Sequence, residues 1–165
     1  MELWRDIPGW EGYYQVSNHG RVRSVTRVIR GATYKGKLLK QVADKDRRMR
    51  VNLSKDSKVH LQVVAALVAK TFIGPRPDGA EVRHLDGNPM NNVATNLAYG
   101  SKSLNTFDSI RHGTHNNARK THCKHGHELS GDNLIMLSGN RRWCRTCKRD
   151  AAARYRANRK KELLK

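Results

Sequence analysis

The 165-residue sequence lacks any apolar run long enough to cross a membrane, and only 37% of its residues are hydrophobic. A single large core is therefore not expected, and small modules with additional support fit better. Only three cysteines occur, an odd number, and no secretory hydrophobic segment precedes them. We therefore expect a cytoplasmic protein with reduced thiols rather than a secreted disulfide scaffold.

Acidic residues are also scarce, because 14 Asp and Glu stand against 33 Lys and Arg and leave a net charge of +19. Such an excess costs self-repulsion and is usually offset by a polyanionic partner. The charge is uneven, since residues 141–165 hold 11 basic and 2 acidic residues. The composition therefore predicts a protein that binds nucleic acid.

The central part of the chain predicts a helix, two strands and a second helix. Apolar residues recur at helix spacing over residues 59–72, and the Gly- and Pro-rich run 73–79 ends that helix. Strands are expected at 82–84 and 97–99, with a turn at 86–88. A helix should run from 102 to 112, with an N-cap at 100–101, Gly113 just beyond its end, and an apolar face of Leu104, Phe107 and Ile110 toward the core.

This strand–strand–helix unit carries polar residues suited to phosphodiester hydrolysis. His84 is the candidate general base, because neutral imidazole can activate water near pH 7. Asn96 is the candidate orienter of that base, and Asn105 the candidate metal ligand. Asp108 lies on the same helix face as Asn105 at i,i+3 spacing. Oxygen ligands of this kind favour a hard cation such as Mg²⁺ or Mn²⁺.

Three further asparagines, Asn88, Asn91 and Asn92, are interpreted as turn formers, because Asn tolerates left-handed backbone conformations. The order of residues in this part of the chain nevertheless indicates more than a series of turns. The run from Val82 to Asn88, then Asn96 and Asn105, resembles the HNH endonuclease family, most closely its phage and intron-encoded homing branch. The resemblance implies a ββα-metal (His-Me finger) nuclease that hydrolyses DNA with one divalent metal and leaves a 5′-phosphate and a 3′-hydroxyl. It also implies His84 as general base, Asn96 as central Asn and Asn105 as metal ligand.

Arg83 departs from the family pattern, because many members place Asp or another ligand directly before the catalytic His. Asp108 or Asp86 replaces that ligand, or metal binding is weak, or the active site has decayed. We favour Asp108 for its spacing to Asn105. Arg83 is then available to contact a phosphate.

Residues 4–24 resemble the nuclease-associated modular motif that occurs beside HNH domains. The resemblance implies a small β-rich module that contacts DNA. The aromatic residues of this segment are interpreted as its core, while Arg21 and Arg23 are available for phosphates.

Cysteine spacing organises the C-terminal segment. Cys123 and His127 precede Cys144 and Cys147, and two short pairs separated by a turn-bearing segment match a tetrahedral Cys3His zinc site. His122 and His125 compete as the fourth ligand. His127 is preferred because the segment resembles a zinc-ribbon-like module at the ends of phage HNH proteins.

Turns at 132–133 and 139–140 and a strand at 134–137 complete the expected zinc module, and a closed site of this kind is structural rather than catalytic. A basic helix follows it to the end of the chain. The basic residues expected to contact the DNA backbone here are Arg141, Arg142, Arg145, Lys148 and Arg149.

Together these observations predict an α+β protein. Its expected parts are a β-rich DNA-contacting module (1–56), an HNH ββα-metal nuclease domain (57–113), a linker (114–122) and a Cys3His zinc module with a basic helix (123–165). The predicted function is endonucleolytic hydrolysis of double-stranded DNA. No membrane partner is expected, and the sequence leaves the oligomeric state open, with a monomer favoured over a dimer. The alternatives are a non-catalytic DNA-binding protein on a degenerate HNH scaffold and, more weakly, an RNA-binding protein, which would need exposed aromatics on a sheet face.

Overall fold

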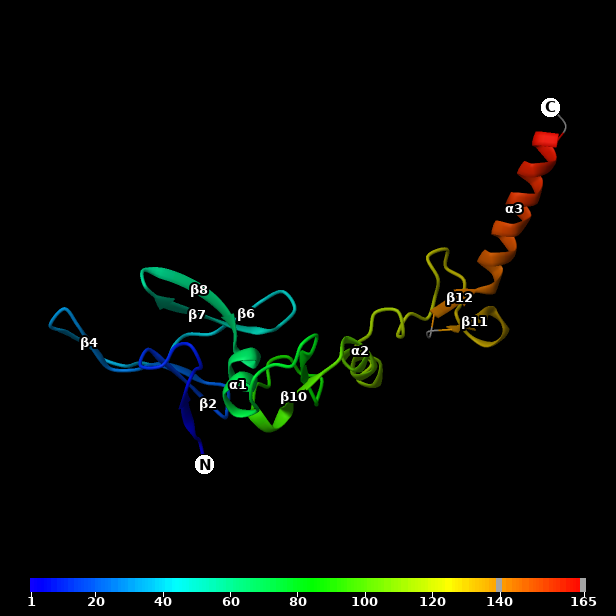
Figure 1. Ribbon diagram of the computed structural model, residues 1–165. Helices are drawn as coiled ribbons and strands as arrows, with labels where there is room; N and C mark the ends of the chain where they lie inside the picture. The colour runs from blue at the N-terminus through cyan, green and yellow to red at the C-terminus, as the bar shows by residue number, and fades with distance from the viewer. Residues whose placement is uncertain (139–140, 164–165) are drawn as a thin grey trace. The chain divides into compact units, whose positions relative to one another are not determined.

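The computed structural model describes residues 1–138 and 141–163, so the turn expected at 139–140 lies outside the described residues. The chain forms two compact units, Met1–His112 and Gly113–Lys165, coloured blue to green and yellow to red in Figure 1. Both helices and strands contribute to the fold, as the predicted α+β class requires.

The first unit contains ten strands, two α-helices and one 3-10 helix among the described residues. In chain order these are β1 (Trp4–Asp6), β2 (Tyr14–Ser17), β3 (Val22–Ser24), β4 (Arg27–Ile29), β5 (Ala32–Tyr34), β6 (Val42–Ala43), β7 (Met49–Lys55), β8 (Lys58–Val63), α1 (Val64–Phe72), β9 (Glu81–His84), η1 (Ala94–Asn96), β10 (Leu97–Gly100) and α2 (Lys102–Arg111). The strands form antiparallel sheets in the orders β1-β2-β3, β4-β5, β6-β7-β8 and β9-β10.

The prediction of a helix that begins at residue 59 is wrong for residues 59–63. Lys58–Val63 forms strand β8, and α1 begins at Val64. The six residues of β8 pair with β7 across a two-residue turn at Asp56 and Ser57, whose φ angles of 52° and 61° suit a tight hairpin. Leu61, counted in the helical pattern, is 56% exposed. Tertiary pairing with β7 therefore overrides an apolar spacing that also fits a helix.

One hydrophobic core joins the two modules that the sequence separates at residues 56 and 57. Ile7, Val16 and Val22 of the N-terminal segment pack in the same cluster as Val64 and Leu97. This predicted boundary falls inside the β7–β8 hairpin. The structure divides the chain at 112/113, one residue before the second predicted boundary at 113/114. Burial of a common apolar surface makes residues 1–112 a single structural unit.

The ββα unit of the sequence is present as β9, β10 and α2. Ser101 caps α2, since its Oγ accepts a hydrogen bond from the Leu104 backbone N–H at 3.2 Å. Gly113, with φ of 66°, follows the last turn as predicted. The apolar face of α2 does not point into the core: Leu104, Phe107 and Ile110 are 47%, 56% and 37% exposed. The side of α2 that carries Asn105 and Asp108 packs on β9 instead.

The second unit contains η2 (Gly131–Asn133), β11 (Leu134–Leu137), β12 (Arg141–Cys144) and α3 (Arg145–Leu163). Strands β11 and β12 pair antiparallel, with Leu134 opposite Cys144. The predicted linker 114–122 belongs to this unit rather than standing free. The Arg142 guanidinium donates to the carbonyl oxygens of Asn117, Ala118 and Lys120 at 2.8–3.0 Å and ties the segment to β12.

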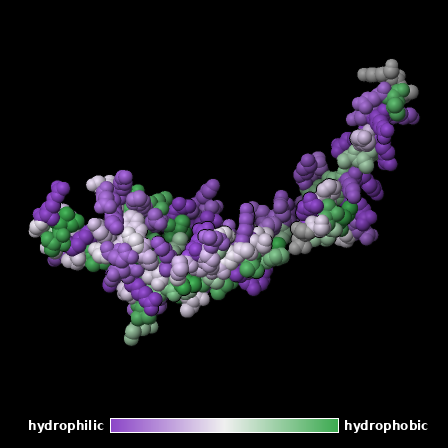
Figure 2. Space-filling view, in the orientation of Figure 1, coloured by the Kyte–Doolittle hydropathy of each residue, from purple (hydrophilic) through white to green (hydrophobic). Residues whose placement is uncertain are grey.

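Polar residues cover most of the face shown in Figure 2. Residues 148–163 of α3 are exposed throughout, as a helix without an apolar face predicts. Hydrophobic side chains gather at the β4–β5 hairpin, where Val28, Ile29 and Tyr34 are exposed. Within residues 1–138 and 141–163, we find no helix with the length and apolar character needed to span a bilayer.

Candidate nuclease site and metal-ligand cluster

His84 is the last residue of β9, and its side chain contacts Asn92. The His84 Nε2 atom lies 3.2 Å from Asn92 Oδ1, and Asn92 is only 5% exposed. The sequence indicates only a turn former at Asn92, so its contact with the candidate base is a feature that sequence reasoning misses. An Asn in an Asn-rich turn gives no local signal of such a contact, because the partner lies eight residues away.

Asn96, the expected orienter of His84, holds the β9–β10 loop instead. Its side chain accepts from the Asp86 backbone N–H at 3.0 Å and donates to Asp86 Oδ1 at 2.9 Å. Its backbone carbonyl accepts from the Leu85 N–H at 2.9 Å. Asn96 therefore shapes the backbone that follows His84, while Asn92 makes the side-chain contact.

Asp86, one of the two candidate replacements for the missing ligand, is occupied within this loop. Hydrogen bonds from the Asn88 backbone N–H and the Asn91 side chain are the main causes that lower the pKa of Asp86 to about 2. The Asn96 amide adds a third. These bonds keep Asp86 ionised and direct both of its oxygens into the turn.

Asn105 projects from α2 toward the first residue of β9. Its Nδ2 donates to Glu81 Oε2 at 2.8 Å, so its amide oxygen is directed away from that carboxylate. Glu81 is a second feature that the sequence reasoning missed. Because it shares a strand face with Arg83, strand periodicity was the signal that could have found it.

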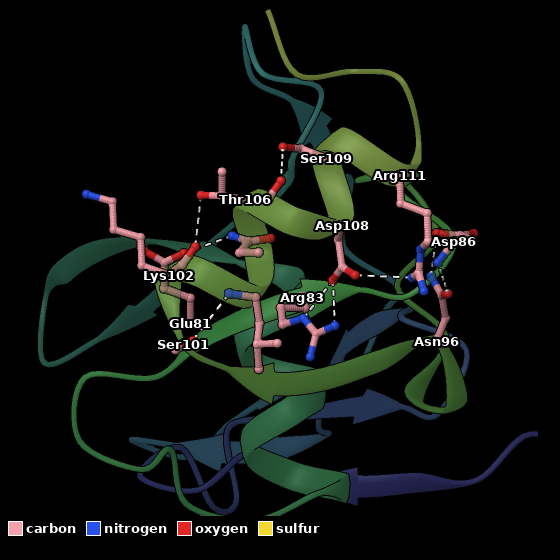
Figure 3. Close-up of polar contacts among 12 residues, drawn as sticks. Glu81, Arg83, Asp86, Asn96, Ser101, Lys102, Thr106, Asp108, Ser109 and Arg111 are labelled. Carbon is pink, nitrogen blue, oxygen red and sulfur yellow. Dashed lines mark hydrogen bonds and ion pairs between the residues drawn. The ribbon is translucent and has the colours of Figure 1, made fainter. Parts of the chain in front are cut away.

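Arg83 and Asp108 form a largely buried ion pair between β9 and α2 (Figure 3). Arg83 Nε and Nη2 lie 2.7 and 2.6 Å from Asp108 Oδ2, and Arg111 Nη2 lies 3.1 Å from the other oxygen. Asp108, the favoured replacement ligand, is thus neutralised by two guanidinium groups. The ion pair in turn holds Arg83 against α2. The Arg83 side chain also lies close to the Gly100 backbone, because a Cβ at that glycine would lie 2.4 Å from Arg83 Cδ.

The exposure of the two arginines predicts different effects on stability. Arg83→Ala is expected to destabilise the first unit by about 3–5 kcal/mol, because it strips a buried carboxylate of its main partner. Arg111→Ala, which removes a 65% exposed partner of the same carboxylate, should cost about 1 kcal/mol or less. Hydrogen exchange of the α1 amides in urea measures the loss of stability in each of the two variants. Equal effects would show that the pair does not hold β9 to α2.

The N-terminal arginines expected to contact DNA stack on one aromatic ring. The guanidinium carbons of Arg21 and Arg23 lie 5.8 and 4.3 Å from the centre of the Trp4 ring. Arg21 also pairs with Glu2, and Arg23 Nε and Nη2 donate to Gln15 Oε1 at 2.9 and 2.7 Å. These contacts preorganise the two cations along β3 and the turn before it.

In the second unit, the basic residues expected to contact DNA differ in how firmly contacts within the unit hold them. Arg142 is committed to backbone carbonyls, and Arg145 Nε donates to the Asp132 carbonyl at 2.6 Å. Arg141 is exposed and donates to the Ser138 carbonyl at 3.4 Å. Lys148 lies 5.9 Å from the Trp143 ring centre, and Arg149 is exposed on α3.

Cys123, His127, Cys144 and Cys147 bring their ligand atoms together within 4.8 Å of one another. Measured separations are 3.6 Å for Cys123 Sγ to Cys147 Sγ, and 3.5, 3.6 and 3.3 Å from His127 Nδ1 to the sulfurs of Cys123, Cys144 and Cys147. A tetrahedral zinc ion with ligands at 2.0–2.3 Å requires edges of about 3.4–3.8 Å. The donor set and its spacing therefore fit zinc, with His127 in the cluster.

The thiol chemistry also favours a cation at this cluster. The Cys147 backbone N–H donates to Cys144 Sγ and is the main cause that lowers the pKa of Cys144 to about 6. Burial, together with the neighbouring thiols, raises the pKa of Cys147 to about 12. Several thiolates at one point repel one another, and a divalent cation removes that repulsion.

Comparison with known proteins identifies related sequences for the first unit. A family model of the NUMOD4 motif matches residues 2–54, and a family model described as HNH endonuclease matches residues 63–106. These matches follow the two modules expected from the sequence, although the structure joins them in one core.

One curated protein and one solved structure match a larger part of the chain. The sequence is 39% identical over 113 residues to the DNA endonuclease I-HmuI of Bacillus phage SP01, an overlap of 68% of this chain and 60% of that protein. A solved structure described as "DNA binding and cleavage by the HNH homing endonuclease I-HmuI" matches with a TM-score of 0.59 and 38% identity, over 71% of this chain and 63% of that chain. The chain thus spans about three-fifths of the length of each relative.

Proposed function

We propose that this chain, which pairs a NUMOD4 motif with an HNH domain and belongs with the HNH homing-type endonucleases by sequence and fold, hydrolyses phosphodiester bonds in DNA. The predicted family resemblance is confirmed by these matches. The observation that carries the activity is His84 at the end of β9, with its ring held by Asn92 within a ββα unit.

His84 acts as the general base in this proposal. Its ring removes a proton from the attacking water, and the water oxygen forms a bond to phosphorus. The bond between phosphorus and the 3′ oxygen then breaks, and that oxygen takes a proton from solvent, which leaves a 5′-phosphate and a 3′-hydroxyl. Asn96 contributes by fixing the backbone on which His84 ends. In this proposal Asn92 contacts the His84 ring and Asn96 fixes the backbone, whereas the sequence predicts Asn96 as the single orienting residue.

A divalent cation, Mg²⁺ or Mn²⁺, is the proposed cofactor, and it would stabilise charge on the phosphate and the leaving oxygen. Asn105 offers its amide oxygen, and the Glu81 carboxylate beside it adds a hard oxygen donor. Asp108, given as a ligand with Asn105 from the sequence, serves here to anchor Arg83. The oxygen donor set fits a hard cation rather than zinc.

Double-stranded DNA is the proposed substrate, and the basic residues supply its electrostatic recognition. Arg21 and Arg23 lie near the start of the chain, and Arg141, Lys148 and Arg149 lie in the second unit. Zinc bound by the Cys3His cluster is proposed to fold that unit and to present α3, rather than to take part in cleavage.

Conversion of supercoiled plasmid tests the proposed function. We expect nicking or linearisation with Mg²⁺ or Mn²⁺, and no conversion with chelator, on a plasmid that carries the DNA neighbouring the protein's own gene. Ligation of the products would report the 5′-phosphate and 3′-hydroxyl ends. Absence of conversion on that plasmid with either metal would reject a nuclease and leave a DNA-binding protein.

A metal titration of the same assay tests the role of Asn105. Asn105→Ala is expected to raise the Mg²⁺ concentration needed for half-maximal cleavage by about 10-fold or more, because the amide oxygen proposed to bind the metal is lost. Ser103→Ala, an exposed change on the same helix, should leave the titration unchanged. An unshifted titration curve for Asn105→Ala would remove Asn105 from the metal site.

A further inference from the structure

Asn92 is held so that its oxygen, and not its nitrogen, faces His84. Asn92 Nδ2 donates to the Met90 carbonyl at 3.1 Å, which directs Oδ1 toward His84 Nε2 at 3.2 Å. The reverse orientation of the amide would set its oxygen against the Met90 carbonyl, so the backbone fixes the assignment.

An acceptor at this position determines which nitrogen of His84 carries the proton. Because Asn92 Oδ1 can only accept, Nε2 must be the N–H and Nδ1 must hold the lone pair. A general base needs that lone pair on the nitrogen facing the water. Asn92 therefore selects both the tautomer and the orientation of the ring.

The N-terminal motif packs directly on Asn92. The turn of Ser17, Asn18, His19 and Gly20 closes with a hydrogen bond from the Gly20 N–H to the Ser17 carbonyl at 3.0 Å. The Asn18 carbonyl accepts from the Ala94 backbone N–H at 2.8 Å, two residues beyond Asn92. This turn therefore fixes the backbone that carries Asn92.

Gly20 makes the closest approach of the turn to Asn92. Its φ is +83°, and an added Cβ would lie 2.8 Å from Asn92 Cβ and 3.0 Å from the Asn92 carbonyl oxygen. Both residues are buried, and Gln41 Nε2 donates to the Gly20 carbonyl at 2.8 Å. A side chain at position 20 is expected to displace Asn92, because the hydrogen bond from Gln41 holds the Gly20 backbone in place.

We propose that the Ser17–Gly20 turn positions the catalytic base, acting through Asn92 on the tautomer and orientation of His84. The N-terminal motif is thereby part of the active-site machinery in addition to any contact it makes with DNA. This inference rests on the proposed function in taking His84 as the base. Asn92 and Gly20 are positioning residues, since neither needs to touch the reacting atoms.

Nitrogen-15 NMR of the histidine rings in the full chain tests the first step without any activity measurement. At about pH 8, where an ordinary imidazole is neutral, we expect His84 as the Nε2–H tautomer with an observable ring N–H proton, the signal being assigned by its loss in His84→Gln. Asn92→Leu, which removes the acceptor, should lose that proton signal. An Nδ1–H tautomer in the wild type, or an unchanged signal in Asn92→Leu, would overturn the proposal.

A pair of glycine variants tests the second step. Gly20→Ala is expected to weaken the His84 N–H signal and to lower kcat by about 10–100-fold, the usual loss when an orienting partner is removed, with KM for DNA little changed. Gly12→Ala is the matched control, because Gly12 lies in the same motif with φ of +72° and a Cβ there would meet none of the described atoms within 4 Å. Equal losses in both variants would mean that backbone strain, not contact with Asn92, is responsible.

The two readouts separate failure of this inference from failure of the proposed function. A His84 N–H signal that depends on Asn92 and on Gly20 supports the positioning contact even if plasmid is never cleaved. Cleavage that persists at the wild-type rate in a folded Asn92→Leu chain overturns the inference and leaves the nuclease intact. Retention of fold is checked by thermal unfolding of each variant.

Discussion

His84→Ala is expected to lower the rate of DNA cleavage by about 10²–10⁴-fold at saturating metal, the contribution typical of a positioned general base. DNA binding should be unchanged, because the ring carries no net charge when it acts as a base and because the residues proposed to contact phosphates are arginines and lysines. Supercoiled plasmid conversion gives the rate, and fluorescence anisotropy with labelled DNA gives the affinity. Wild type and variant should share the same dependence of affinity on salt.

His112→Ala provides the histidine control for this measurement. His112 follows α2 in the same unit as His84, and it packs against Gly87, where a Cβ would lie 2.5 Å from its ring. We expect His112→Ala to cleave at close to the wild-type rate. Cleavage by His84→Ala at that same rate would withdraw the base assignment, and lost DNA binding would instead indicate a folding defect.

Cys144→Ser is expected to release zinc and unfold the second unit while the first unit stays folded. Within 113–138 and 141–163, Cys144 is the one buried residue, so this unit has almost no apolar core to stabilise it. Structural zinc in small modules supplies about 10–16 kcal/mol of apparent binding free energy, which exceeds what such a core offers. Elemental analysis should fall from about one zinc per chain to near zero.

Histidine variants sharpen this test, because two histidines lie close together at the cluster. His127→Ala should lose zinc, whereas His125→Ala should retain it, since the His125 contribution is a backbone N–H to Cys123 Sγ that alanine preserves. Hydrogen exchange should show lost protection in β11, β12 and α3 but not in α1. Full zinc content in Cys144→Ser would disprove the Cys3His site, and loss of zinc in His125→Ala alone would transfer the ligand role to His125.

The parts of the fold that the sequence predicts well are those specified by local chemistry. Ser101 and Gly113 mark the ends of α2 because a side-chain cap and a left-handed residue have strong local preferences. Cys144 and Cys147 assemble with Cys123 because the donor spacing is itself the requirement of a metal site.

The parts that escape sequence reasoning depend on partners far along the chain. The first turn of the expected helix is strand β8, because β7 offers it a full ladder of hydrogen bonds. Asp108 has the spacing to Asn105 that is expected of a second metal ligand, but it forms an ion pair with Arg83 of β9. Asn92 looked like one turn residue among three, and only its position under Gly20 and beside His84 distinguishes it.

Charge and hydropathy likewise predict exposure only on average. The spacing of Leu104, Phe107 and Ile110 is that of a core-facing stripe, but Asp108 and Asn105 occupy the face of α2 that meets β9. The helix is oriented by polar contacts with the strand, which outweigh burial of its apolar residues. Sequence periodicity cannot tell whether polar contacts or apolar burial will orient the helix, because the residues that make the polar contacts, Glu81 and Arg83, lie on β9.

The core shared between Ile7, Val16 and Val64 sets where this protein can be recombined with others. A chimera spliced at residues 56 and 57 would separate β7 from β8 and expose the apolar residues that both halves bury. A splice at residues 112 and 113 leaves that interior whole. Exchange of segments between this chain and its relatives should therefore succeed when residues 1–112, which hold both the N-terminal motif and the ββα unit, are inherited together.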